Sequence, residues 1–516
     1  MYPGLQAAIR PNQPAIVMAQ SGETITYAEL ERRSNRLAHF LRANRLTRLD
    51  RYAIFIENNA RYVECCSAGE RAGLYFTCIN SYLMPDELAY ILDNSESKIL
   101  ITSTAKREVA LKALAQCPQI ERCLIVDGAG DGARVDNLDA AVDGFPDTPI
   151  ADESLGAALL YSSGTTGRPK GVLRPLPESS PARQLPILDF FGDSWRFRDG
   201  MIYLSPAPLY HAAPLVGVSL TIRAGGIAVI MEHFDPEQCL ALVERYRVTH
   251  SQFVPTMFSR MLKLPDAARR RYDLSSLEIA IHAAAPCPIL VKEQMIDWWG
   301  SIIFEYYGAT EGLCLVACDT AEWLAHRGTV GRVLAGELHV LDEQMRPVPA
   351  GTLGTLWFKP ASPFEYFKDP VNTAEARSPD GTLCTVGDVG YVDEDGYVYL
   401  TDRRSFMIIS GGVNIYPQEC ENLLITHPLV GDAAVFGVPN VDLGEEVKAV
   451  VQPMPGIRPD AAFAEELIAF CRQHLAHIKC PRSIDFEEQL PRLPTGKLYK
   501  RLLRDRYWGG RTNRIV

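Results

Sequence analysis

The chain has 516 residues, of which 47% are hydrophobic and 22% are charged. This composition is typical of globular domains and excludes a disordered or fibrous chain. At roughly 150 residues per domain, the length predicts two or three domains and excludes a single small binding module. The net charge is −11, from 52 basic and 63 acidic side chains. This charge argues against nucleic acid as a partner, because such surfaces need clustered excess Lys and Arg.

Cysteine usage and hydropathy bear on the cellular compartment. The 13 cysteines include no CxxC pair and no metal-ligand spacing, so we expect reduced, mostly buried thiols and a cytoplasmic protein. The N-terminus has neither the basic start nor the apolar core of an export signal. No window approaches the roughly 18 uninterrupted apolar residues of a membrane span, so no transmembrane segment is expected. Peripheral membrane contact and a homodimer both stay open.

The first strong element is a helix over 26–42, where Thr26 and Glu29 form a capping box and apolar residues repeat on one face. A second helix is predicted over 235–246, with Asp235 as its cap. Short apolar runs between such helices are expected to be strands, at 157–162, 201–206, 225–231, 250–255 and 277–283. This alternation predicts helices packed on mostly parallel sheets.

The sequence pattern changes near residue 380, from alternating helices and strands to short strands separated by turns. Short strand-like runs there are separated by Asp-Gly pairs at 380–381 and 395–396, which predict hairpin turns. A small separate domain is therefore expected to begin soon after these turns.

The strongest chemical signal is the loop YSSGTTGRPKG at 161–171. Its glycines let backbone N–H groups approach a ligand, its hydroxyls add donors, and Lys170 supplies a mobile cation, which together suit a polyphosphate. It is not a Walker loop, because Pro169 stands where that motif needs glycine and Gly171 follows the lysine. The residues predicted to bind the phosphates are Ser162, Ser163, Gly164, Thr165, Thr166, Gly167 and Lys170.

This loop resembles the signature of the adenylate-forming superfamily, which includes acyl-CoA synthetases, firefly-type luciferases and the adenylation domains of peptide synthetases. Further motifs follow in the order of that family, namely YYGATEG (306–312), VGDVGY (386–391), DRRSFMIISGGVNIYP (402–417) and PTGK (494–497). The resemblance covers about residues 20–505. It implies an α/β fold, with a large body of mixed sheets flanked by helices at 1–404 and a small, mobile α+β lid domain at 405–516.

The activity implied by the resemblance is that of an ATP-dependent acyl-CoA synthetase. Such an enzyme joins a carboxylic acid to ATP as acyl-AMP, releases pyrophosphate and passes the acyl group to coenzyme A, with Mg²⁺ as cofactor. Small residues near the expected pocket favour a lipophilic acid. The alternatives are a luciferase-like enzyme, a peptide-synthetase-like module, disfavoured because no carrier domain follows Trp508, and a catalytically silent nucleotide sensor.

The resemblance also implies roles for the charged and hydroxyl residues of these motifs. Lys497 would bridge the carboxylate and the α-phosphate, where an ammonium offsets developing negative charge. Thr310 would lie near the α-phosphate, and Glu311 would hold Mg²⁺, which prefers oxygen ligands shared with phosphate. Asp388 would accept hydrogen bonds from the ribose, and Arg403 would reach the ribose or the phosphates.

The remaining assignments concern the adenine, the acid and coenzyme A. Tyr307 and Gly308 would lie at the adenine, opposite a loop where the family commonly has Gly-Gly-Ala and this chain has Ala283, Ala284 and Ala285. His211 and Ala309 would line the acyl pocket, although a lone His in an apolar stretch is also typical of a core residue. Gly411 and Gly412 would line the pantetheine tunnel. The domain hinge would be Ser405, where the family usually has Asp or Lys.

Overall fold

The computed structural model describes residues 1–132, 134–162, 169–360, 362–403, 406–411, 413–492 and 498–508, without the side chains of Arg403 and Arg501. The chain forms two compact units. The first consists of Met1–Phe253, Leu264–Ile281 and Ser362–Ala374, and the second of Val254–Lys263, His282–Ala361 and Glu375–Val516. These units do not coincide with the expected domains 1–404 and 405–516, whose proposed hinge, Ser405, lies outside the described residues.

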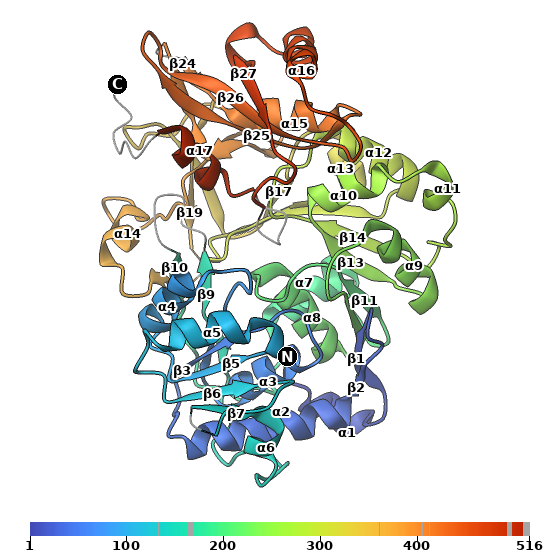
Figure 1. Ribbon diagram of the computed structural model, residues 1–516, viewed down its shortest axis with the longest axis vertical. Helices are drawn as coiled ribbons and strands as arrows, with labels where there is room; N and C mark the ends of the chain where they lie inside the picture. Colours follow the sequence, from blue (N-terminus) through green and yellow to red (C-terminus); the bar gives the residue numbers. More distant parts are fainter. Residues whose placement is uncertain are drawn as a thin grey trace. The chain divides into compact units, whose positions relative to one another are not determined.

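A parallel sheet with strand order β7-β6-β5-β3-β4-β8 organises the N-terminal part of the first unit. Helices α4 and α5 pack on it over an apolar core (Figure 1). The strands are β3 (Arg51–Phe55), β4 (Tyr75–Cys78), β5 (Ile99–Thr102), β6 (Arg122–Ile125), β7 (Val135–Asn137) and β8 (Ala157–Ala158). The helices are α2 (Tyr27–Ala43), α3 (Arg61–Arg71), α4 (Pro85–Asn94), α5 (Arg107–Leu114) and α6 (Leu138–Val142).

A second sheet of this unit has the strand order β14-β13-β11-β12-β1-β2. Its pairs β1–β12, β11–β12 and β11–β13 are parallel, as the alternation of elements predicts. The strands are β1 (Pro14–Met18), β2 (Thr24–Thr26), β11 (Ile202–Ser205), β12 (Ile227–Ile230), β13 (His250–Phe253) and β14 (Ile279–His282). The helices are α1 (Gly4–Ile9), α7 (Pro186–Trp195), α8 (Ala212–Ala224), α9 (Pro236–Tyr246) and α11 (Asp266–Arg269).

The run 157–162, expected to be one strand, is divided between two sheets. Its first part, β8, pairs with β4, whereas β9 (Leu160–Ser162) pairs with β10 (Lys170–Leu173), which in turn pairs with β20 (Glu365–Tyr366). Leu159 lies between the two parts and is fully buried. The expectation of a single strand was wrong because the chain changes its pairing partner at this residue.

The second unit is built largely from antiparallel strands. Their orders are β17-β16-β15, β18-β19-β21-β22 and β24-β23-β26-β25, with β27 beside β26. The strands are β15 (Ile303–Tyr307), β16 (Leu315–Cys318), β17 (Arg332–Ala335), β18 (Glu337–Leu341), β19 (Gly354–Lys359), β21 (Asp388–Val392), β22 (Val398–Arg403), β23 (Ile408–Ser410), β24 (Val413–Ile415), β25 (Val430–Asn440), β26 (Gly444–Pro453) and β27 (Ser483–Phe486). The helices are α10 (Pro255–Leu262), α12 (Ile289–Trp299), α13 (Thr320–Ala325), α15 (Pro417–Thr426), α16 (Ala461–His474) and α17 (Lys500–Trp508), while α14 (Pro370–Glu375) ends where the first unit meets the second along the chain.

Three local predictions are confirmed. Helix α2 begins after Thr26, whose side chain accepts a hydrogen bond from the Glu29 backbone while Glu29 caps in return. Helix α9 begins after Asp235, whose side chain accepts a hydrogen bond from the Gln238 backbone. The Asp-Gly pair at 395–396 lies in the turn of the β21–β22 hairpin, where Gly396 has a φ of 85°. Such a positive φ favours glycine.

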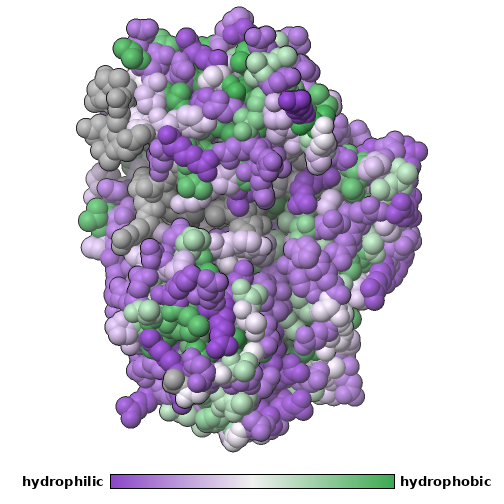
Figure 2. Space-filling view, viewed as in Figure 1, coloured by the Kyte–Doolittle hydropathy of each residue, from purple (hydrophilic) through white to green (hydrophobic). Residues whose placement is uncertain are grey.

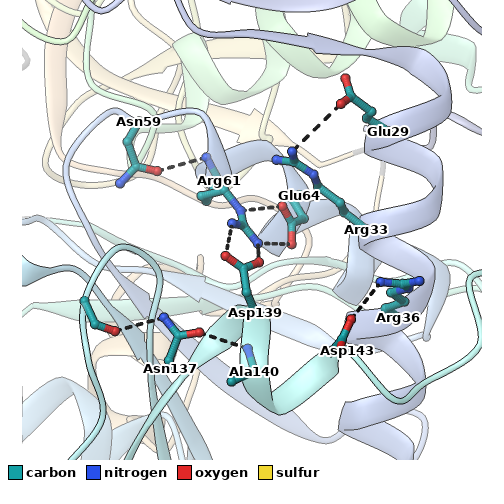
Figure 3. A network of polar contacts seen from close by, with 11 residues as sticks. Glu29, Arg33, Arg36, Asn59, Arg61, Glu64, Asn137, Asp139, Ala140 and Asp143 are labelled. Carbon is teal, nitrogen blue, oxygen red and sulfur yellow. Dashed lines mark hydrogen bonds and ion pairs between the residues drawn. The ribbon is translucent and has the colours of Figure 1, made fainter.

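An ion-pair network ties two helices of the first unit together (Figure 3). The Arg61 guanidinium, on α3, forms two hydrogen bonds to Glu64 and two to Asp139 of α6, with distances from 2.7 to 3.0 Å. The Glu64 side chain is 2% exposed and that of Asp139 is 64% exposed. We call this the Arg61 network, and it joins α3 to α6.

The surface and the thiols agree with the composition. The face seen in Figure 2 is mainly hydrophilic, with apolar side chains in small scattered groups. All 13 cysteines are free, and most of them are buried, as expected. Among the described residues, no helix combines the length and the apolar character needed to cross a bilayer.

Candidate active site

Two predicted nucleoside-binding residues meet in the second unit. Tyr307 is the last residue of β15 and Asp388 is the first residue of β21. The Tyr307 hydroxyl donates a hydrogen bond of 2.6 Å to Asp388 Oδ2, although the two residues are 81 positions apart. The contact combines an aromatic ring, which can stack on a base, with a carboxylate, which can accept from hydroxyls.

The predicted phosphate and metal residues follow Tyr307 directly in a tight turn. The Gly312 N–H donates to the Ala309 carbonyl at 2.9 Å, and Gly312 has a φ of 69°. Gly308 is exposed, Thr310 is half-buried and Glu311 is buried. The described residues contain no cluster of three or more His, Cys, Asp or Glu suited to a metal ion. A single carboxylate fits Mg²⁺, which commonly binds through one or two carboxylates together with substrate phosphates.

The alanine loop has an unusual backbone. Ala283 is buried, whereas Ala284 and Ala285 are exposed. Ala284 has a φ of 77°, a left-handed conformation that is unfavourable for a residue with a Cβ. The methyl group at this position is therefore accommodated only with backbone strain, whereas glycine would adopt the conformation freely.

Only the ends of the predicted phosphate loop lie among the described residues. Ser162 and Lys170 are opposite one another in the antiparallel β9–β10 pair, while Ser163, Gly164, Thr165, Thr166 and Gly167 fall outside. The Lys170 ammonium donates a hydrogen bond to Asn372 Oδ1 and lies 5.0 Å from the Tyr366 ring centroid. The Lys170 ammonium therefore contacts one residue of β20 and one of α14. The sequence reasoning missed Asn372, because no motif marks it.

The predicted acyl-pocket histidine begins a helix of the first unit. His211 is the N-cap residue of α8 and is half-buried, and its ring centroid lies 4.3 Å from that of Tyr210. This places an aromatic pair at the helix start, which is compatible with either a pocket wall or a packed core position.

The C-terminal predictions are only partly described. Gly411 has a φ of 56°, and its N–H donates to the Leu443 carbonyl at 2.8 Å. The Arg403 backbone pairs with Asp388 in the β21–β22 hairpin. The Arg403 side chain, Ser405, Gly412 and Lys497 lie outside the described residues.

A buried ion pair follows the predicted catalytic lysine by three positions. Lys500 Nζ lies 2.8 Å from Glu421 Oε1, and both side chains are at most 6% exposed. Burial raises the pKa of Glu421 to about 7, although the Lys500 charge opposes this shift. The pair anchors the beginning of α17 to α15.

Comparison with known proteins gives the family. The model of the AMP-binding enzyme family matches residues 5–365, and that of the AMP-binding enzyme C-terminal domain matches residues 419–497. A feruloyl-CoA synthase from an Amycolatopsis species is 35% identical over 98% of both chains. The fatty acid–[acyl-carrier-protein] ligase ScoC of Streptomyces coeruleorubidus is 32% identical over 98% of this chain and 95% of its own. The crystal structure of ATP-bound MatB from Rhodopseudomonas palustris is similar with a TM-score of 0.80 at 28% identity, covering 98% of this chain and 99% of that one.

The chain therefore belongs to the AMP-binding enzyme family and has the adenylate-forming fold. Within this family it is an AMP-forming acid–thiol ligase, an enzyme that uses ATP to activate an acid for transfer to a thiol.

Proposed function

We propose that this ligase activates a lipophilic carboxylic acid as acyl-AMP, releases pyrophosphate and transfers the acyl group to coenzyme A. The observation that carries the proposal is the Tyr307–Asp388 hydrogen bond, which joins two motifs assigned to the adenosine of ATP. Two full-length relatives support a lipophilic acid, since one is named for feruloyl and the other for fatty acid.

In this proposal the described residues of the second unit bind and orient the nucleotide. The Tyr307 ring stacks on adenine, while the Asp388 carboxylate accepts hydrogen bonds from the ribose and is itself oriented by the Tyr307 hydroxyl. Thr310 donates to the α-phosphate. Orientation of this kind lowers the barrier because it holds the two reacting anions together.

The negative charges of ATP and of the attacking carboxylate are neutralised by groups other than those that orient the nucleotide. Lys497 stabilises the charge that develops when the carboxylate attacks the α-phosphate. Glu311 would hold Mg²⁺, which supplies positive charge to the ATP phosphates when it is bound. Lys170, near the end of the phosphate loop, would supply a further cation to the phosphates, and its ammonium donates a hydrogen bond to Asn372. The free thiols support a reducing, cytoplasmic compartment.

The proposal is tested by ATP–pyrophosphate exchange across a panel of fatty, aromatic and steroid acids with acetate as the small control. We expect exchange that depends on the added acid, with kcat/KM higher for a lipophilic acid than for acetate. No exchange with any acid would overturn the enzymatic proposal. A higher kcat/KM for acetate would overturn only the proposal that the substrate is lipophilic, and acid activation itself would stand.

The acceptor has a second candidate, an acyl carrier protein, because the 32% identical relative is named as a ligase for one. After acyl-AMP has formed, the enzyme is offered coenzyme A and a phosphopantetheinylated carrier protein at equal concentration. Mass spectrometry should find the thioester mainly on coenzyme A. A thioester mainly on the carrier protein would reassign the acceptor.

A further inference from the structure

A buried charge cluster lies behind two of the predicted nucleotide-binding segments. Lys292 Nζ, on α12, lies 2.5 Å from Glu305 Oε2, on β15, and the two side chains are 0% and 5% exposed. The same carboxylate oxygen lies 3.4 Å from His282 Nε2. His282 directly precedes the alanine loop, whereas Lys292 and Glu305 belong to none of the motifs in the sequence.

The Glu305 carboxylate lies beside both ends of the segment that contains the alanine loop. His282 is the last residue of β14, directly before Ala283, and Lys292 lies in the first turn of α12, the helix that follows the loop. Both side chains approach the same oxygen atom, so the two ends of the segment 283–291 lie close together, and the hydrogen bond from Lys292 to Glu305 holds the C-terminal end of that segment against β15. We call Lys292, Glu305 and His282 the loop clamp.

Glu305 also connects the clamp to the predicted adenine site. Side chains alternate along a strand, so Glu305 and Tyr307 lie on the same face of β15. The carboxylate that holds the alanine loop is therefore two residues from the tyrosine that contacts Asp388.

The loop clamp contains one buried cation and one buried carboxylate, whose charges offset one another. Burial and the nearby Lys292 charge lower the pKa of His282 well below its usual value, so its imidazole is neutral and Lys292 is the cation opposite Glu305. The Lys292 ammonium also lies 4.8 Å from the Trp323 ring centroid. A desolvated pair of this kind is weak support for stability but can enforce one arrangement of the segments it joins.

The left-handed backbone of Ala284 needs support from the surrounding structure, and the loop clamp can provide it. Left-handed conformations of residues other than glycine persist where the surrounding structure over-determines them. Ala284, with a φ of 77°, lies inside the clamped segment.

We propose that Lys292 and Glu305 are positioning residues for nucleotide binding: their ion pair fixes the C-terminal end of the segment 283–291 against β15, close to His282 at the other end, and so maintains the strained conformation of Ala284. The proposal rests on the nucleotide site proposed above, and names residues beyond the motifs that define that site.

The test compares Lys292→Met with Arg61→Met, because each change removes a cation from a nearly buried glutamate. We expect Lys292→Met to raise the KM for ATP and the dissociation constant of AMP about tenfold, the magnitude of left-handed strain at one alanine, with a smaller change in kcat. Arg61→Met should leave both constants within about twofold. An unchanged KM for ATP in folded Lys292→Met would overturn the proposal.

A rescue variant separates positioning from simple destabilisation. Adding Ala284→Gly to Lys292→Met should recover most of the ATP affinity, since glycine adopts the left-handed conformation without the clamp, whereas it should not restore the melting temperature. Failure of this rescue would reduce the clamp to a structural role and overturn the proposal.

If Lys292→Met does not fold, the double variant Lys292→Met/Glu305→Met is used, because replacing both partners of a buried pair by apolar residues is often neutral for stability. It is read by the same two constants and the same glycine rescue. Wild-type enzyme without acid-dependent exchange would instead refute the proposed function, so the two failures are distinguishable.

Discussion

The loop clamp and the Arg61 network use the same chemistry in different surroundings. Each places a cation on a glutamate that is at most 5% exposed. In the clamp the cation is also completely buried, whereas in the network the second carboxylate, Asp139, is 64% exposed. Burial raises the pKa of Glu305, while hydrogen bonds from Arg61 lower the pKa of Asp139.

The difference shows that the role of a charge cluster depends on the segments it joins. The Arg61 network connects the helices α3 and α6 (Figure 3), neither of which contains a predicted site residue. The clamp joins α12 to β15 beside the end of β14, and the ends of β14 and β15 lead directly into the alanine loop and the Thr310–Glu311 turn. We therefore expect changes in the network to affect stability and changes in the clamp to affect ATP binding.

The largest effect should come from replacing Lys497, which belongs to neither cluster and is proposed to act directly in acyl-AMP formation. Lys497→Ala should lower the rate of acyl-AMP formation about 10²- to 10³-fold, the usual effect of removing one electrostatic stabiliser of a transition state. Its melting temperature should match that of the wild type. Thiolysis of supplied acyl-AMP should largely survive, and equal loss of both half-reactions would contradict the assignment.

The next effect concerns the stability of the network. Arg61→Ala leaves the buried Glu64 without its guanidinium and should destabilise the fold by about 3 kcal/mol, with unchanged KM for ATP. Because a chain of two units need not unfold in a single step, apparent melting temperatures of variant and wild type are compared in the same buffer. A large rise in the KM for ATP would abolish the contrast between network and clamp.

A smaller effect is expected at the adenosine site. Tyr307→Phe keeps the ring but removes the hydrogen bond to Asp388, a loss of about 1 kcal/mol, which corresponds to roughly a fivefold weaker AMP affinity by calorimetry. Tyr307→Ala, which also removes the stacking ring, should bind more weakly still. If the two variants bind AMP as tightly as the wild type, the adenine assignment is wrong.

The smallest effect is a difference in pH dependence. Asp139 has a lowered pKa when folded, so its contribution to stability is present above its unfolded pKa and lost as the pH falls through the folded value. Glu305 has a raised pKa when folded, so its contribution is present below its unfolded pKa and lost as the pH rises through the folded value.

Melting temperatures of wild type, Asp139→Asn and Glu305→Gln measured from about pH 3 to pH 8 test this sign. On acidification the wild-type advantage over Asp139→Asn should shrink, by less than about 1 kcal/mol because Asp139 is largely exposed. The wild-type advantage over Glu305→Gln should grow on acidification. Slopes of the same sign would refute the assigned directions.

Features encoded in neighbouring residues could be predicted from the sequence. The Thr26–Glu29 capping box and the Asp395-Gly396 turn depend on contacts a few residues apart, and both occur as expected. The division of 157–162 between two sheets could not be anticipated, because it depends on pairing with β4 and β10.

In the candidate active site, too, contacts between residues that are distant in the sequence could not be predicted. Tyr307 and Asp388 could be named through family motifs, and the structure places them in contact. Lys292, Glu305 and Asn372 belong to no such motif, and their partners are set by tertiary packing. Ordinary charged residues in a helix or strand give no local signal that they will be buried together.

The central claim, formation of an acyl-AMP intermediate, is tested most directly with a carboxylic acid labelled with oxygen-18 in both carboxylate oxygens. Attack of the carboxylate on the α-phosphate and later cleavage of the acyl–oxygen bond by the thiol should leave one labelled oxygen in each AMP. Mass spectrometry should therefore find one label in AMP for each thioester formed. Unlabelled AMP, or label in inorganic phosphate together with ADP, would contradict the account.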